Sequence, residues 1–229
     1  MTIKRKILLA LPHQHQEKIR VFYRNLRAWI SEGFWWSIPL INIVNILRYG
    51  FKGPRSLDIL KVDPNIIVHK IPGFKRRYSG KVIPSERWLD IKPLGKNNRF
   101  DIISWRLQTG SWTGSGAFER MRRVIARNPG ADGCRTEADI IKRYQRLDKL
   151  IEEIRLGGEI RADWRDGIFV GVSDVGEIVL SRAGFHRLML ARAMGLPYIN
   201  AHVGFVHRDA VVSGLYDELR RDSRRDGCV

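Results

Sequence analysis

The stretch that decides the fold is IFVGVSDVGEIVLSRAGFHRLMLARAMGLPYINAHVGFVHR, residues 168–208. It opens with two short runs rich in β-branched and other apolar residues, 168–172 and 177–180. Such runs are typical of strands. The four residues between them are Ser-Asp-Val-Gly, and Asp and Gly are residues that suit a tight turn. These features predict a β-hairpin.

A helix and a third strand follow the hairpin. Residues 186–194 have helical character, Gly195 can end the helix in the left-handed conformation, and Pro197 prevents its continuation. A third β-prone run covers residues 198–206. The order of these elements predicts a ββαβ unit.

The turn between the second strand and the helix is the candidate functional site. A helix start leaves backbone N–H groups unpaired and carries the positive end of the helix dipole, so residues 184–188 form a potential anion site. Gly184 lets the backbone approach a ligand, and the Arg187 guanidinium is a bidentate donor suited to phosphate. His186 has two interpretations, a phosphate ligand or a first-turn residue hydrogen-bonded to the backbone.

Residues 184–199 resemble a known motif. Their sequence, GFHRLMLARAMGLPYI, is similar to the pattern Gly-x-(His/Arg)-Arg-x-x-x-Ala-x-x-x-Gly of the ParB/sulfiredoxin-like (ParB N-terminal-like) family. That family includes ParB-like N-terminal domains, sulfiredoxin and a free-serine kinase. The specific likeness covers residues 166–208. In the family the motif holds the phosphates of CTP, ATP or ADP, so the resemblance implies that this chain binds a nucleotide.

The resemblance also implies which residues touch the nucleotide. His207 and Arg208, after the third strand, resemble the basic end of several bacterial members of the family. The expected phosphate-binding residues are Gly184, Phe185, His186, Arg187, His207 and Arg208. The expected ligand is ATP or CTP, with Mg²⁺ as a candidate counter-ion.

Catalysis is less strongly indicated than binding. Kinase-type relatives use a carboxylate as base or magnesium ligand, because phosphoryl transfer needs an oriented hydroxyl and a shared charge. Many relatives have an acidic residue or Asn immediately before the motif glycine, where this chain has Ala183. Asp163, Asp166 or Asp174 could supply a carboxylate instead, although turns and caps are the usual role of Asp. Nucleotide hydrolysis and phosphoryl transfer stay open, and the sulfiredoxin cysteine has no counterpart in the motif.

The charge of the chain indicates polyanionic partners. Lysines and arginines number 41 against 24 aspartates and glutamates, which gives a formal net charge of +17 at pH 7. Such a surface attracts nucleic acid, nucleotide phosphates and anionic lipid alike. The cluster Lys75, Arg76 and Arg77, followed by Tyr78, could hold a DNA or RNA backbone, or it could be a solvated loop. A basic nucleic-acid-binding module without catalysis is therefore the alternative function.

Two helical patterns precede these segments. Residues 14–32 carry apolar side chains at helical spacing with basic residues between them, which predicts an amphipathic helix with a basic face. Residues 34–47 are more apolar, but Pro39, Asn42 and Asn45 interrupt them, and the run is shorter than the ~20 residues of a membrane span. We expect a buried helix there. A third, weaker alternative is a non-catalytic partner protein that this segment anchors.

Short strands and helices are expected in the middle of the chain. Residues 66–68 and 81–83 are β-prone runs separated by Pro and Gly. Two short helices are expected at 99–107 and 117–127, around a Gly-rich turn that lacks the Lys-Ser or Lys-Thr of a P-loop.

The clearest helical pattern covers residues 137–156. Thr136 takes the N-cap position with Asp139 three residues later, and Gly157 and Gly158 stop the helix. Its outer face mixes acidic and basic residues, so we interpret the helix as a structural strut.

Together these features predict an α+β protein, with a C-terminal ParB/sulfiredoxin-like ββαβ unit packed with a mainly helical N-terminal region. The predicted divisions are a basic helical region at 1–58, a mixed region at 59–134, and residues 135–229 with the leading helix, the ββαβ unit and a basic tail that frays beyond a short helix. Two cysteines without CxxC spacing, and a His13-x-His15 pair without a third ligand, support neither a disulfide framework nor a metal site. Without an export signal, the cytoplasm is the expected location.

Overall fold

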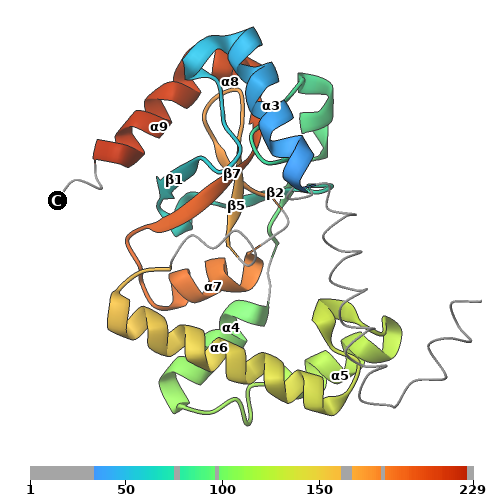
Figure 1. Cartoon of the computed structure of the whole chain (residues 1–229). Coiled ribbons are helices and arrows are strands. Elements are labelled where there is room, and N and C mark those ends of the chain that lie inside the picture. Colours follow the sequence, from blue (N-terminus) through green and yellow to red (C-terminus); the bar gives the residue numbers. More distant parts are fainter. Residues whose placement is uncertain (1–33, 75–77, 96–97, 161–166, 182–183, 226–229) are drawn as a thin grey trace, which may run out of the picture.

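The computed structural model describes residues 34–74, 78–95, 98–160, 167–181 and 184–225. Within these residues a seven-stranded mixed sheet carries helices at both of its ends (Figure 1). The mixture of helix and strand confirms the predicted α+β class.

Strand β7 (Ile199–His207) is the centre of the sheet. It pairs in parallel with β5 (Phe169–Val172) on one side. On its other side its first half pairs with β1 (Ile59–Val62), antiparallel, and its last residues pair with β3 (Lys81–Ile83), parallel. Two short strands fit end to end because β7 is nine residues long. All but one of its residues are buried, as expected for a strand with neighbours on both sides.

The predicted hairpin is present. Strand β6 (Ile178–Ser181) runs antiparallel to β5, and the turn between them closes when the Ser173 amide donates to the Glu177 carbonyl at 2.9 Å. Gly176 has φ 81°, a left-handed conformation that glycine adopts without strain. Beyond β6 the sheet continues with β2 (His69–Ile71) in parallel and β4 (Lys92–Pro93) antiparallel to β2.

One predicted strand is wrong. Residues 66–68 do not form a strand, because the segment begins with a 3-10 turn, η2 (Pro64–Ile66). The Asp63 carboxylate accepts a hydrogen bond from the Asn65 amide and Pro64 supplies a helix-compatible φ, so local capping overrides the β-prone composition. The strand starts later, at His69.

Helix α7 (Phe185–Ala193) links β6 to β7 and lies at one end of the sheet (Figure 1). Gly195 has φ 66°, which confirms the predicted left-handed helix end. At the other end of the helix Gly184 has φ 85°, and a Cβ built on it would lie 2.5 Å from the Ile168 Cα. Only glycine fits this contact, and it presses the start of α7 against the residue that precedes β5.

Three further helices lie at this end of the molecule: α4 (Asn98–Thr109), which contacts α7, then α5 (Ala117–Arg127) and α6 (Glu137–Gly157), with the 3-10 turn η5 (Ala131–Gly133) between the last two (Figure 1). Side chains of α4, α6 and α7 join one apolar core with the inner face of the sheet. Tyr144 lies at the centre of the helical part, where its hydroxyl donates to the Ala117 carbonyl at 3.0 Å and its ring lies 4.7 Å from that of Trp112.

The predicted start of α6 is confirmed. Thr136 and Asp139 form a reciprocal capping box, and Gly158 closes the helix with φ 70°.

A smaller apolar cluster covers the other face of the sheet. Its members come from strands, from the loop before β3 and from the 3-10 helix η4 (Ser85–Asp90). The buried residues of the cluster are Ile71, Phe74, Ile83, Trp88, Phe169, Val179 and Phe205. One sheet and its two apolar faces thus combine strands from the 59–134 and 135–229 regions.

The C-terminal helices α8 (Arg208–Val212) and α9 (Leu215–Arg225) cover the end of the sheet opposite α7 (Figure 1). Arg220 is buried there, 2.6 Å from the Asp217 carboxylate and 3.7 Å from that of Asp58. The Tyr216 hydroxyl donates to Asp58 as well, at 2.7 Å. The predicted short helix is therefore present and reaches Arg225, where a buried arginine and tyrosine hold it to the body, and the residues after it lie outside the described ranges.

Helix α3 (Phe34–Tyr49), followed by η1 (Gly50–Lys52), contradicts the expectation of a buried helix. Its contact with the body is polar: Asn42 accepts a hydrogen bond from the Ser56 amide, and Asn45 donates to the carbonyls of Pro54 and Gly80, all at 2.7 Å. Its apolar residues Ile43 and Leu47 face outward. Among the described residues, no helix is long and apolar enough to cross a membrane.

We expect Asn45→Leu to destabilise the fold. The change leaves two carbonyl oxygens at a buried site without their donor, so the free energy of unfolding should fall by about 2–4 kcal/mol in urea titrations. The matched control is Leu47→Asn, two residues later on the exposed face, which should cost less than about 1 kcal/mol. Equal losses of stability in the two variants would contradict the conclusion that α3 buries Asn45 and exposes Leu47.

Candidate functional site

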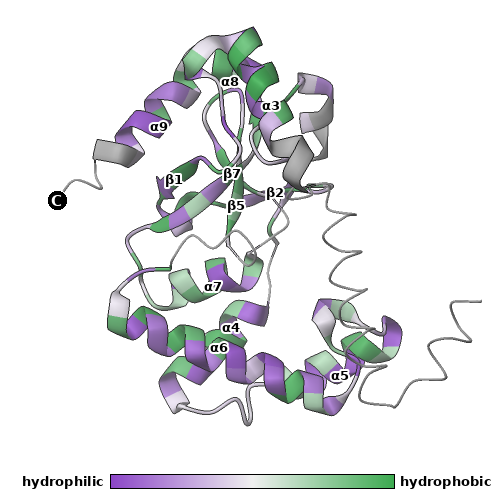
Figure 2. Cartoon of the chain, viewed as in Figure 1, coloured by the Kyte–Doolittle hydropathy of each residue, from purple (hydrophilic) through white to green (hydrophobic). Residues whose placement is uncertain are grey.

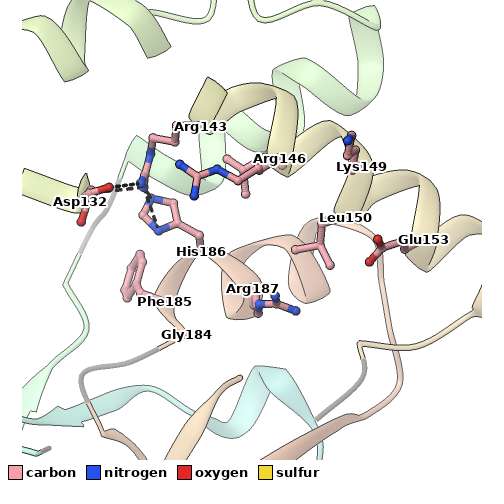
Figure 3. Close-up of a pocket in the computed structure, with 11 residues that line it drawn as sticks. Asp132, Arg143, Arg146, Lys149, Leu150, Glu153, Gly184, Phe185, His186 and Arg187 are labelled. Atoms are coloured by element: carbon pink, nitrogen blue, oxygen red, sulfur yellow. Dashed lines mark hydrogen bonds and ion pairs between the residues drawn. The ribbon is translucent and has the colours of Figure 1, made fainter. Parts of the chain in front are cut away.

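The candidate site is a cavity of about 460 Å³ between the first turn of α7 and one face of α6 (Figure 3). Charged groups dominate its wall. The charged and polar side chains that line it are Asp132, Arg143, Arg146, Lys149, Glu153, His186 and Arg187.

Helix α7 contributes the backbone donors that the sequence predicts. Its first turn closes with the Leu188 amide donating to the Gly184 carbonyl at 2.9 Å. The amides of residues 185–187 precede that bond and have no carbonyl one helical turn earlier, so they form the positive end of the helix. Gly184, Phe185, His186 and Arg187 all line the cavity, and the structure brings these four predicted residues together.

Helix α6 contributes cations that sequence reasoning missed. Arg143, Arg146, Leu150 and Glu153 follow one another at helical spacing and lie on the side of α6 that faces α7 (Figure 3). The interpretation of α6 as a strut accounts only for its buried stripe of Ile140, Tyr144, Ile151 and Ile154. The one signal in the sequence was the three-residue step between the two arginines, which a solvated face shows equally often.

Arg143 connects the two helices and the loop before α6. Its Nη2 atom lies 3.1 Å from a carboxylate oxygen of Asp132 and 2.9 Å from Nε2 of His186 (Figure 3). Its Nη1 donates to the Asp132 carbonyl at 3.3 Å. The Nε of Arg143 is buried and has no hydrogen-bond partner among the described residues. Asp132 has φ 53°, so the residue that supplies this carboxylate has a left-handed backbone conformation, which is uncommon outside glycine.

His186 is a neutral acceptor in this arrangement. Burial, followed by the nearby charges of Arg143 and Arg99, lowers the pKa of His186 to about 3. At neutral pH the imidazole is therefore uncharged, and a ring nitrogen can accept the Arg143 hydrogen bond. The bond goes to a side chain and not to the backbone. His186 thus orients a cation instead of supplying one.

Two more arginines border the site. The Arg99 guanidinium lies 5.0 Å from the centre of the Phe185 ring, and burial lowers the pKa of Arg99. Arg187 lines the cavity half-exposed, and no hydrogen bond or ion pair joins its guanidinium to another described residue. Arg187 is therefore free to contact a ligand.

The structure separates His207 and Arg208 from the other predicted site residues. β7 begins at the α7 end of the sheet, so its last residue, His207, lies at the opposite end, beside α8 (Figure 1). His207 is buried, and its ring accepts a hydrogen bond from the Asp209 amide at 3.1 Å as the cap of α8. Arg208 is exposed and lines a different hollow together with Arg48. The prediction that these two residues belong to the phosphate site is wrong, because the nine residues of β7 carry them to the other end of the sheet.

The remaining candidates add no described residue to the cavity. Lys75, Arg76 and Arg77, the carboxylates Asp163 and Asp166, and Ala183, His13 and His15 lie outside the described residues. Asp174 lies in the β5–β6 turn, at the other end of β6 from Gly184. Within the described ranges, no three His, Cys, Asp or Glu side chains are grouped closely enough to hold a metal ion.

No protein-family model, curated protein or solved structure matches this chain.

We expect His186 to make the fold acid-sensitive. Its folded-state pKa lies near 3, below the unfolded value of about 6.5, so below pH 6.5 the unfolded chain takes up a proton that the folded chain refuses. Stability is then complete above about pH 6.5 and falls by up to about 1.4 kcal/mol for each pH unit below it. His186→Gln keeps an acceptor for Arg143 but does not titrate, so this part of the slope should disappear in urea unfolding between about pH 7 and about pH 4.5.

The control for this experiment is His69→Gln. His69 is half-exposed and contacts Glu177 at a distance from the cavity, so the variant should keep the contribution of His186. Identical pH slopes for the wild type and His186→Gln would refute the neutral, buried imidazole.

Proposed function

We propose that the chain binds the phosphates of a nucleotide, ATP or CTP, at the turn formed by residues 184–187. The observation that carries the proposal is the convergence of four cations and a helix N-terminus on one cavity. Arg143, Arg146, Lys149 and Arg187 outnumber the carboxylates of Asp132 and Glu153, and His186 adds no charge. A cavity with this excess favours an anionic ligand.

The hydrogen-bond donors of the site favour a phosphate ligand over a peptide carboxylate or a metal ion. First-turn amides and guanidinium groups are donors, and a phosphate offers several acceptor oxygens to them at once. A volume of about 460 Å³ falls within the size range of small-ligand sites. The order β6, Gly184 turn, α7 also agrees with the likeness to the ParB/sulfiredoxin-like motif, which supports the choice of a nucleotide.

We expect ATP and CTP, each with and without Mg²⁺, to bind the wild type in isothermal titration calorimetry. Arg187→Gln and Arg146→Gln should each raise Kd about tenfold or more, because a hydrogen bond to a charged group contributes about 1.5–3 kcal/mol. Arg155→Gln is the matched control: it removes the same charge from α6, but Arg155 pairs with Glu152 and does not line the cavity.

Equal affinities for wild type and Arg187→Gln would contradict the proposal. A duplex DNA that competes with the nucleotide, and whose own binding Arg187→Gln leaves unchanged, would instead favour the basic nucleic-acid-binding module.

The described side chains favour binding over turnover. Asp132 is committed to Arg143, and the lone pair of His186 faces the same guanidinium, so neither is positioned as a base. Glu153 is the carboxylate of the cavity wall that no ion pair joins to another described residue, and it is the candidate to share a Mg²⁺ ion with the phosphates.

We therefore expect bound nucleotide to stay intact. After incubation with Mg²⁺, chromatography should recover the added ATP or CTP with no more diphosphate or inorganic phosphate than a protein-free sample. Mg²⁺-dependent phosphate release that Glu153→Gln abolishes, with binding retained, would show hydrolysis and overturn this expectation.

A further inference from the structure

Helix α3 presents a continuous apolar stripe to solvent. Leu40, Ile43 and Leu47 are 62%, 54% and 80% exposed, and Phe51 in the following turn is 74% exposed. The spacing of three and four residues places Leu40, Ile43 and Leu47 on one side of the helix. In Figure 2 the coloured part of α3 is mostly green, the colour of apolar residues. Contiguous exposed apolar surface of this kind marks an interaction site.

The exposure of the stripe follows from how α3 is held. Its polar residues Asn42 and Asn45 bond to the backbone of the body, and Tyr49 packs against the core. Turning the helix to bury Leu47 would break three hydrogen bonds of 2.7 Å, two of them from a buried amide. The fold therefore fixes the apolar face outward.

Cations border the stripe. Arg48 and Lys52 are exposed at its C-terminal end, and the Arg55 guanidinium lies 5.9 Å from the centre of the Phe51 ring. A hollow of about 620 Å³ between α3 and α8 is lined by Arg48 and Arg208. No hydrogen bond or ion pair joins either guanidinium to another described residue. Apolar side chains next to unpaired cations match a surface whose anionic groups cover a hydrocarbon layer.

We propose that this face of α3, with the Arg48 and Arg208 hollow beside it, docks on the surface of a bilayer that contains anionic phospholipid. The 16-residue helix is too short to span and would lie in the plane of the interface, with Leu47 and Phe51 inserted and a lipid phosphate between the two arginines. A second copy of the chain would carry the same net charge of +17, and like charges oppose its docking on this face. The net charge of +17 attracts the chain to an anionic membrane surface, as the cations beside the stripe do.

Vesicle flotation with the full chain tests the proposal. The wild type should float with phosphatidylcholine vesicles that contain ~30 mol% phosphatidylserine, and much less with pure phosphatidylcholine. The double variant Ile43→Glu/Leu47→Glu should bind the anionic vesicles at least about tenfold more weakly. Leu156→Glu is the control, because Leu156 is a 90% exposed leucine on α6, and it should bind as the wild type does.

A second pair of changes separates charge from apolar insertion. Arg48→Gln/Arg208→Gln should lower the preference for phosphatidylserine over phosphatidylcholine while the thermal melt stays that of the wild type, since both residues lie at the surface. Flotation of the Ile43→Glu/Leu47→Glu variant equal to that of the wild type would overturn the proposal. So would a lipid-free dimer in sedimentation analysis that Leu47→Glu converts to monomer, because a second copy would then cover the face.

Discussion

The contact between Gly184 and the backbone of Ile168 is the constraint on which the candidate site depends. No side chain fits where a Cβ of Gly184 would lie, 2.5 Å from the Ile168 Cα, and the positive φ of Gly184 turns the chain directly from β6 into α7. The first turn of α7 is therefore pressed against the sheet, and residues 184–187 line a cavity whose other wall is α6. The cavity lies where α7 begins in contact with Ile168, the residue that precedes β5.

Within the cavity, one arginine organises the charges. Arg143 bonds to Asp132, which has a left-handed backbone conformation, and to His186. Burial first, and then the nearby arginines, lower the pKa of His186 and keep it neutral. A protonated His186 would add a fifth cation next to four others and would lose its bond to Arg143. The site instead keeps its positive charge on guanidinium and ammonium groups, which stay charged at neutral pH.

The two ends of the sheet carry surfaces of different character. The α7 end has a polar, cationic cavity, whereas the opposite end has the apolar stripe of α3 beside Arg48 and Arg208. The buried group of Arg220, Asp217, Asp58 and Tyr216 holds α9 against β1 and the loop after η1, and so keeps the second surface in place. A nucleotide site at one end and a lipid-facing helix at the other would leave both surfaces accessible at once.

The sequence by itself determined the local elements: the β5–β6 hairpin, the capped start of α6, the left-handed end at Gly195, and the four site residues that are adjacent in the chain. Turn and cap residues act on their immediate neighbours, so their effects can be predicted from order alone. Only the tertiary structure decided that Arg143 and Asp132 join the site, that the nine residues of β7 carry His207 away from it, and that α3 buries its asparagines and exposes its leucines. Those outcomes depend on which elements pack together. An amphipathic helix buries its apolar face when it lies on an apolar core, but it exposes that face when its polar side chains bond to backbone groups of the body.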